Sequence, residues 1–349
     1  MLSTLLLYAL VLVGATALCW WGSLRLERGA EVLSRAYGLP EVVQGTLVVA
    51  VASSLPELTT VVFSAALHGD FELGMSAIVG SAIFNILIIP GLSAWAGDGG
   101  LRADRALVYR DAQFYLTSVA VLLLTFSFAV IYAPVEGAEL TGRLTRVPAM
   151  VPLLLYGLYL FLQHQETREH SVVRDEATEG GKDPREGVGR AWRDMGLGVV
   201  AVVVAVEGLL IVAIGLGDLM GTPSFLWGAT VVAAATSLPD AIISLRSAGR
   251  GQGSLSLGNV LGSNIFDLLV AIPAGVLIAG ATQVDYRVAA PLMAFLTLGT
   301  IVLFAATRTN LRLGRREATL LLLLYVAFVV WLGLETAGVT SFLAGAAAS

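Results

Sequence analysis

The stretch GTLVVAVASSLPE at residues 45–57 returns as GATVVAAATSLPD at residues 228–240, with 8 of 13 positions identical at an offset of 183. A second pair of stretches follows in the same order. GMSAIVGSAIFNIL at residues 74–87 matches SLGNVLGSNIFDLL at residues 256–269, with 5 identities at an offset of 182. Two ordered matches at nearly one offset indicate that the chain is built from two related halves.

The composition around these repeats is that of a membrane protein. Of 349 residues, 56% are apolar and only 13% are charged, against about 25% charged in an ordinary soluble domain. The mean hydropathy is +0.81. Ten apolar stretches are each about as long as the roughly 20 residues that cross a bilayer. They lie at residues 3–22, 40–66, 73–97, 107–133, 147–164, 195–217, 224–248, 255–280, 286–306 and 316–337. The sequence therefore predicts an all-α polytopic membrane protein with ten transmembrane helices.

The repeat predicts how the two halves are oriented. Five predicted helices separate equivalent positions, and five is odd, so the second copy crosses the membrane in the opposite sense to the first. We expect two inverted five-helix repeats, at residues 1–164 and 195–349, joined by a polar linker at residues 165–194. The repeated motifs fall within residues 40–97 and 224–280. Inverted repeats of this kind form substrate sites near the bilayer midplane.

The basic residues predict the topology. Of the 21 Lys and Arg residues, 18 fall after odd-numbered predicted helices and 3 elsewhere, so the linker should be cytoplasmic and both termini outside. The first stretch lacks a basic n-region and is expected to be retained as a span. We therefore expect an integral protein of a prokaryotic-type cell (inner) membrane.

Other classes of partner are not indicated. The net charge is −5 and the basic residues form no single patch, which argues against a nucleic-acid partner. The lone Cys19 cannot form an intramolecular disulfide, and we expect it in the core. No enzyme activity, cofactor or required protein partner is expected.

Proline interrupts two of the predicted helices near their centres. Pro56 and Pro239 are each followed by an acid, Glu57 or Asp240. Proline has no N–H and clashes with the carbonyl four residues back, so each should break its helix and free nearby carbonyls. Hydroxyls add further oxygen ligands, because residues four apart share one face of a helix. These pairs are Ser53 with Glu57, Ser81 with Asn85, Thr236 with Asp240, and Ser263 with Asp267.

Three acids are predicted to lie within the membrane, namely Glu57, Asp240 and Asp267. At about 2.5–3.5 kcal/mol each, they would together cost roughly 7–10 kcal/mol, which favours a functional role. The candidate ligands are all oxygens, with no Cys or His expected beside them. Such a set suits hard cations and not zinc or copper. Because Mg²⁺ gives up its water reluctantly, Ca²⁺ and Na⁺ are favoured.

The motifs SSLPE with GSAIFN, and TSLPD with GSNIFD, resemble the two α-repeats of the cation/calcium exchanger superfamily. Asp240, together with Asn85 and Asp267 at equivalent positions, resembles the potassium-dependent sodium/calcium exchangers. The Glu-bearing motif usual in proton/calcium exchangers is absent. The resemblance implies that Glu57 and Asp240 hold Ca²⁺ with the carbonyls of Ser53 and Thr236. It assigns Na⁺ to groups at neighbouring positions, with Asn85 and Asp267 completing the centre. Those positions are Ala50, Ser54, Ser81, Ala233, Ser237 and Ser263.

The resemblance implies a secondary active antiporter that exchanges Na⁺ for Ca²⁺ by alternating access, with K⁺ or a proton on Asp267 as an open question. A proton-coupled Ca²⁺ or Mg²⁺ exchanger and a channel are alternatives. A more distant alternative is an intramembrane aspartyl protease that uses Asp240 and Asp267 as its dyad. Glu207 has no acidic counterpart, because Leu24 occupies the equivalent position. A packed acid and a gating or proton-linked acid both remain open there.

Overall fold

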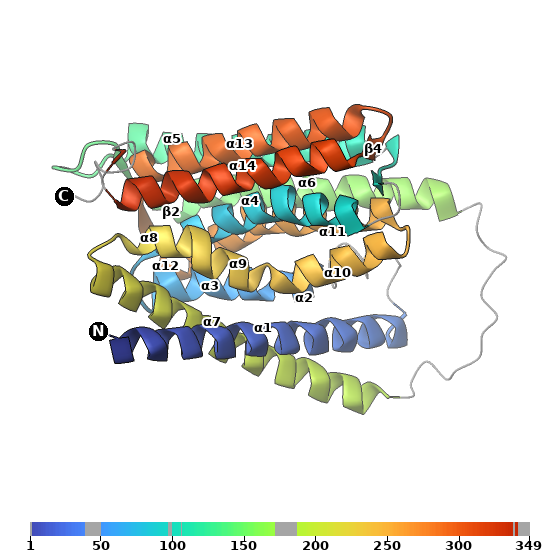
Figure 1. Cartoon of the computed structure of the whole chain (residues 1–349), viewed down its shortest axis with the longest axis horizontal. Helices are drawn as coiled ribbons and strands as arrows, with labels where there is room; N and C mark the ends of the chain where they lie inside the picture. Colours follow the sequence, from blue (N-terminus) through green and yellow to red (C-terminus); the bar gives the residue numbers. More distant parts are fainter. Residues whose placement is uncertain are drawn as a thin grey trace.

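Long runs of Leu, Val and Ala fold into helices that lie side by side in a computed structural model of the chain (Figure 1). The structure describes residues 2–38, 50–96, 100–105, 107–171, 187–337 and 339–340. In chain order the elements are α1 Leu2–Ala36, α2 Ala50–Ser53, α3 Leu55–Ala66, α4 Phe71–Ala96, β1 Leu101–Arg102, the π-helix η2 Leu107–Asp111, α5 Ala112–Tyr132, β2 Thr141–Thr145, α6 Arg146–Ser171, α7 Val188–Met220, α8 Ser224–Trp227, the π-helix η3 Gly228–Val232, α9 Ala233–Thr236, α10 Leu238–Gly249, α11 Gly253–Phe266, the π-helix η4 Asp267–Ala271, α12 Ile272–Ala279, β3 Ala281–Asp285, α13 Tyr286–Arg308, β4 Arg312–Leu313 and α14 Arg315–Thr336.

Within the described residues, eight helices are long and apolar enough to cross a membrane. A ninth span results if the bent pair formed by residues 224–236 and 238–249 is counted as one. The remaining predicted span, 40–66, is represented by α2 and the 12-residue α3, because residues 39–49 lie outside the described part. The all-helical membrane fold is thus confirmed, while the count of ten stays a prediction.

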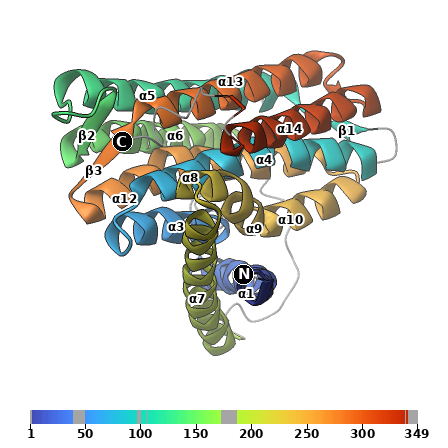
Figure 2. The ribbon, with the colours of Figure 1, turned by 60° about the vertical axis from the view of Figure 1, so that its left-hand side comes forward.

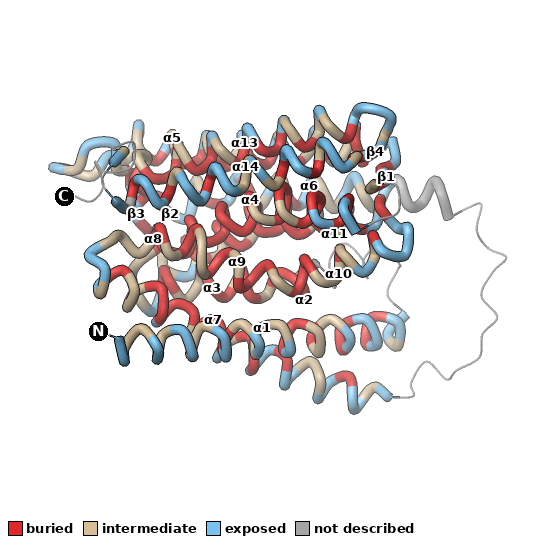
Figure 3. The backbone as a smooth tube through the Cα atoms, in the orientation of Figure 1, coloured by how far each residue is buried: buried red, intermediate tan, exposed pale blue. Residues whose placement is uncertain are grey.

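Helix α4 forms the centre of the molecule. It is apolar around its whole circumference, as expected of a helix surrounded by others, and 89% of its apolar window is buried. It packs against α3, α10, α13, α14 and η3. Buried residues gather along the middle of the bundle, whereas exposed residues follow its outside (Figure 3).

Helices α1 and α7 form an arm pair that packs along one side of the bundle (Figures 1 and 2). Small residues bring the two backbones together. A Cβ on Gly22 would stand 3.0 Å from the Gly198 carbonyl oxygen, and one on Gly29 would stand 2.8 Å from that of Ala191. Close contacts of this kind are typical of helix packing within membranes.

Two short antiparallel clips tie the two halves together at opposite ends of the bundle (Figure 1). Strand β1 pairs with β4, and β2 pairs with β3 through the register Thr141 to Asp285. In the predicted repeats, β1 and β3 occupy equivalent loops, and so do β2 and β4. The two clips are therefore exchanged by the symmetry that inverted repeats would have, which supports that arrangement.

Helix α1 begins and α14 ends at one end of the bundle, whereas α6 ends and α7 begins at the other (Figure 1). Helical structure extends into both edges of the predicted linker, since α6 ends at Ser171 and α7 begins at Val188. Residues 172–186 lie outside the described part. The end of the molecule at which α6 ends and α7 begins is called the linker end below.

Candidate cation site

Both proline motifs break their helices, as predicted. Helix α2 stops at Ser53, and Ser54 (φ −90°, ψ 11°) separates it from α3, which has Pro56 in its first turn. Helix α9 stops at Thr236, and the chain bends by 46° at the following serine before α10 begins. Proline is tolerated in a first turn because the N–H it lacks would have no partner there. Each acid therefore begins a new helix in the middle of the bundle.

The first half-site consists of Glu57, Ser81 and Ser237. The Ser81 Oγ lies 2.6 Å from the Ser237 Oγ and 3.5 Å from Glu57 Oε1. All three residues are buried, with 2% of Glu57 exposed. Glu57 and Ser81 come from one half of the chain, whereas Ser237 comes from the other.

The second half-site consists of the repeat-equivalent residues Asp240, Ser263 and Ser54. The Ser263 hydroxyl donates to Asp240 Oδ2 over 2.7 Å, and its Oγ lies 3.4 Å from the Ser54 Oγ. Again the acid and one serine belong to one half, and the other half supplies the second serine. The repeat thus produces two half-sites with the same connections, each completed across the interface between halves.

An amide network lies between the half-sites. The Asn85 Nδ2 donates to Asn264 Oδ1 over 3.0 Å. The Asn264 Nδ2 in turn donates to the Ala82 carbonyl (3.2 Å) and to the Tyr115 hydroxyl (3.1 Å). Sequence reasoning missed Asn264 and Tyr115, although an Asn in GSNIF where the first repeat has Ala82 was a visible signal. Asn85 donates to Asn264 and also lies near Asp240, whereas the fully buried Asp267 lies near Ser54.

The site is rich in buried acceptor oxygens without hydrogen-bond partners, although Thr236 lies near Glu57 and Ser54 near Asp267. These oxygens are Glu57 Oε2, Asp240 Oδ1, both carboxylate oxygens of Asp267 and Asn85 Oδ1. Leaving such groups unpaired in a low-dielectric interior is costly. Ca²⁺ takes six to eight oxygens and Na⁺ is equally hard, so an excess of acceptors suits a cation.

Other predicted ligands are already engaged within their helix. The Thr236 hydroxyl lies 3.2 Å from the Val232 carbonyl oxygen and 3.3 Å from that of Ala233. The Ala233 carbonyl also accepts from the backbone N–H of Ser237 over 3.1 Å. Ser53 is buried at the end of α2, and Ala50 is the first residue of that helix.

Two equivalent glycines of the repeated motifs, Gly80 and Gly262, differ in their surroundings. A Cβ on Gly80 would stand 2.2 Å from the Ala229 carbonyl oxygen, so this glycine permits close packing of α4 on η3. No atom lies within 4 Å of the place that a Cβ on Gly262 would take. Close packing therefore does not require a glycine at residue 262.

Carboxylates alone do not form a metal cage here. Among the described residues, no three His, Cys, Asp or Glu side chains gather closely enough to hold one ion. A bound cation would need the serine hydroxyls and the amides as well. The fully buried Cys19 of α1 lies within electrostatic reach of Glu57.

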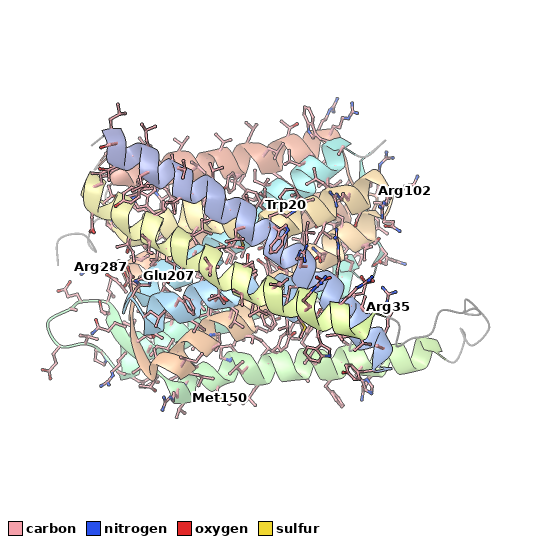
Figure 4. All side chains as sticks on the ribbon, turned by 90° about the horizontal axis from the view of Figure 1, so that it is seen from below. Trp20, Arg35, Arg102, Met150, Glu207 and Arg287 are labelled. Atoms are coloured by element: carbon pink, nitrogen blue, oxygen red, sulfur yellow. The ribbon has the colours of Figure 1, made fainter. Side chains whose placement is uncertain are left out.

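Two further acids lie on the arm pair. Glu207 of α7, which the repeat left unexplained, lies 3.2 Å from the Nε2 of His68 beyond the end of α3 (Figure 4). Glu27 of α1 lies near Asp240, and sequence reasoning missed it.

Comparison with known proteins identifies the family. The family model described as sodium/calcium exchanger protein matches residues 7–165 and 195–334. This chain belongs to that family. The two matched segments of the exchanger family leave out residues 166–194, which include the connection between α6 and α7.

Relatives within and around the exchanger family cover nearly the whole chain. The inner membrane protein YrbG of Escherichia coli is 27% identical over 336 residues, 95% of this chain and 97% of its own. A solved structure of the sodium–calcium exchanger NCX_Mj, soaked with Na⁺ and Sr²⁺, is 25% identical and has a TM-score of 0.57 over 93% of this chain and 98% of its own. The H⁺/Ca²⁺ exchanger CAX, at 16% identity, shares the fold with a TM-score of 0.70 over 97% of this chain and 85% of its own.

Proposed function

We propose that the chain is a secondary active antiporter that exchanges Na⁺ for Ca²⁺ by alternating access. One observation carries the proposal: two buried half-sites, each a carboxylate with two serine hydroxyls, are completed across the interface of the two halves. A site shared in this way changes its geometry whenever one half moves against the other. Membership of the exchanger family and the full-length likeness to NCX_Mj support the same reading.

The proposed ligands are the residues of both half-sites together with the central groups. Carboxylate, hydroxyl and amide oxygens favour hard cations, and both Ca²⁺ and Na⁺ can use such a mixture. The proposed set is Glu57, Asp240, Asp267, Asn85, Ser53, Ser54, Thr236, Ser237, Ser81, Ser263, Ala50 and Ala233.

Charge explains why such a site would exchange ions and not leak them. With Glu57, Asp240 and Asp267 ionised, an empty site carries −3 in a low-dielectric interior, which opposes the change of sides. Three Na⁺ would neutralise it. A single Ca²⁺ leaves −1, which a K⁺ ion or a proton on Asp267 would cancel. Asp267 is thus the proposed origin of any dependence on K⁺ or pH.

The arm pair α1–α7 is the proposed moving element. Its two helices touch each other backbone to backbone, and 11% of the apolar window of α1 and 50% of that of α7 are buried. It can therefore slide over the bundle without opening the core around α4. With the predicted topology, the linker end faces the cytoplasm and both termini face outward.

The decisive experiment is uptake of radioactive calcium into proteoliposomes under imposed Na⁺, K⁺ or H⁺ gradients. We expect an outward Na⁺ gradient to drive uptake, and Glu57→Gln and Asp240→Asn to abolish it. Uptake driven by a proton gradient alone would establish the proton-coupled alternative. Non-saturating flux without countertransport would favour a channel, and uptake that survives both substitutions would refute the site. Cleavage of a membrane peptide that depends on Asp240 and Asp267 would support the protease alternative.

A further inference from the structure

The side of α1 that faces the bundle carries a polar stripe, defined here as Cys19, Ser23 and Glu27. The three residues are spaced by four, so they lie on one face of the helix. Cys19 and Ser23 are completely buried. Leu26, on the same side, packs against Ala52 of α2 directly before the first helix break. The stripe therefore faces the proposed cation site.

The stripe leads from the centre of the bundle toward the linker end. Helix α1 packs against α2, α9 and α10, which flank the two helix breaks, and the charges of Glu57 and Asp240 act on Cys19 and Glu27 respectively. Eight residues separate them, which is about 12 Å along a helix. Figure 4 shows the neighbouring Trp20 at mid-length and Arg35 at the linker end, with the rest of the stripe lying between these two residues in the sequence.

Ser23 and Glu27 each have one buried oxygen that no nitrogen or oxygen of the protein contacts as a hydrogen-bond partner. The fully buried Ser23 Oγ lies beside the Cys19 thiol and bonds to no nitrogen or oxygen. Glu27 Oε1 is also buried and unpaired. Arg25 pairs with Asp194 over 2.9 Å and Arg35 pairs with Glu31, while the charge of Arg28 acts on Glu27. A buried acceptor oxygen of this kind is stabilised by a cation.

The corresponding stripe on the other arm is apolar. At an offset of 183, the equivalents of Cys19, Ser23 and Glu27 are Val202, Val206 and Leu210 of α7, all completely buried. The packing of the arm pair does not need the polar stripe, because Gly22 and Gly29 make the close contacts to α7. Helix α1 therefore carries polar side chains at positions where α7 carries buried apolar ones.

We propose that Ser23 and Glu27 form an access site that holds a hard cation between Asp240 and the linker end. The carboxylate of Glu27 and the hydroxyl of Ser23 are the ligands, and the transported ion is the occupant. The role as a step in transport rests on the exchange proposed above. The asymmetry of the arms makes the access site one-sided, which distinguishes it from the two half-sites.

Sided membrane vesicles test this proposal, with radioactive calcium added to the linker side or to the opposite side. Because one charged ligand is lost, Glu27→Gln should raise the half-saturating Ca²⁺ concentration about tenfold from the linker side and less than about twofold from the other. Ser23→Ala should raise it about threefold from the linker side only. The matched control is Glu31→Gln, which removes an exposed carboxylate one turn further along α1 and should change neither value.

A second measurement does not depend on transport. In a Cys19→Ala background, Ser23→Cys provides a single thiol, and a charged membrane-impermeant methanethiosulfonate reagent is added to either side. We expect modification from the linker side alone, slowed at least about threefold by Na⁺ or Ca²⁺. Protection of this thiol without any gradient-driven calcium flux would support the access site and refute the proposed Na⁺/Ca²⁺ exchange.

Three results would overturn the access site itself. They are equal shifts from both sides in Glu27→Gln, the same shift in Glu31→Gln, and a thiol at residue 23 that neither cation protects.

Discussion

The two half-sites connect equivalent residues, but the distances between the connected oxygens differ. In the first, the longer acid Glu57 lies 3.5 Å from Ser81, and that serine lies 2.6 Å from Ser237. In the second, the shorter Asp240 accepts from Ser263 over 2.7 Å, and that serine lies 3.4 Å from Ser54. The tight contact thus runs between the halves in one half-site and within one half in the other. Equivalent groups therefore meet in both half-sites, but the short contact joins different pairs of them.

The acids should give the largest effect, because each carries the charge of its half-site. Glu57→Gln and Asp240→Asn keep the shape and remove the charge. We expect each to lower calcium transport by at least about 100-fold, since a charge-assisted ligand in a buried site is lost. Initial rates of radioactive calcium uptake provide the measurement. The exposed Glu31→Gln should transport normally, and an acid variant that matched it would remove that half-site from the binding site.

Asp267 should come next, because it belongs to neither half-site and both of its oxygens lack a hydrogen-bond partner. Asp267→Asn lowers the formal charge of the empty site from −3 to −2. A Ca²⁺-loaded site is then neutral without a further cation, so calcium exchange should become independent of K⁺ and pH. Uptake measured over a range of K⁺ concentrations and pH values tests this. If calcium exchange by the wild-type protein does not depend on K⁺ or pH, the role given to Asp267 is contradicted.

Asn264 connects the halves, so its loss should affect both half-sites equally. It accepts from Asn85 and donates to the Ala82 carbonyl and to Tyr115. Asn264→Ala leaves three buried groups with a missing partner, at a cost of roughly 1–3 kcal/mol for each unsatisfied group. We expect a lower melting temperature in detergent and weaker binding of both ions. A variant that weakened only one half-site would show that the network is not a shared support.

The serines that cross between halves provide the direct test of the length difference. Ser237→Ala removes a 2.6 Å contact, whereas Ser54→Ala removes one of 3.4 Å, which is near the limit of a hydrogen bond. Ser237→Ala should weaken calcium binding by about 1 kcal/mol, or fivefold, and Ser54→Ala by much less. Calcium titrations of the two purified variants supply the comparison. Equal losses would mean that the two half-sites respond alike despite their geometry.

Much of the cation site could be predicted because the two repeats share recognisable residues in the sequence. The prolines predicted both breaks. The i, i+4 pairing of Ser53 with Glu57 and of Thr236 with Asp240 stays a prediction, because each pair spans the break between two helices. The spacing could not show that Ser81 meets Ser237 across the halves, since a contact between helices depends on their packing. The role of Asn264 was missed for the same reason.

The arm pair was less predictable. Cys19 and Glu27 belong to a helix outside the repeated motifs, so no internal match pointed to them. Glu207 drew attention as an acid in an apolar span, but its contact with His68 comes from a turn that lies far away in the sequence. Partners of this kind follow from the position of α7 beside α3, which no local pattern encodes.

The smallest expected effect concerns this contact, which breaks the symmetry between the arms. The equivalents of His68 and Glu207 are Gly251 and Leu24, so the pair that holds α7 to the bundle cannot form at the equivalent positions of α1. The His68 and Glu207 side chains are 21% and 34% exposed, and an ion pair this accessible to solvent contributes at most about 1 kcal/mol. A double-mutant cycle of His68→Ala and Glu207→Gln, read out by melting temperature and by transport rate, should give a coupling of that size. If the pair holds α7 in this position, both single variants should raise the transport rate slightly, by less than about fivefold. A slower rate in both would mean instead that the pair stabilises the step that limits transport.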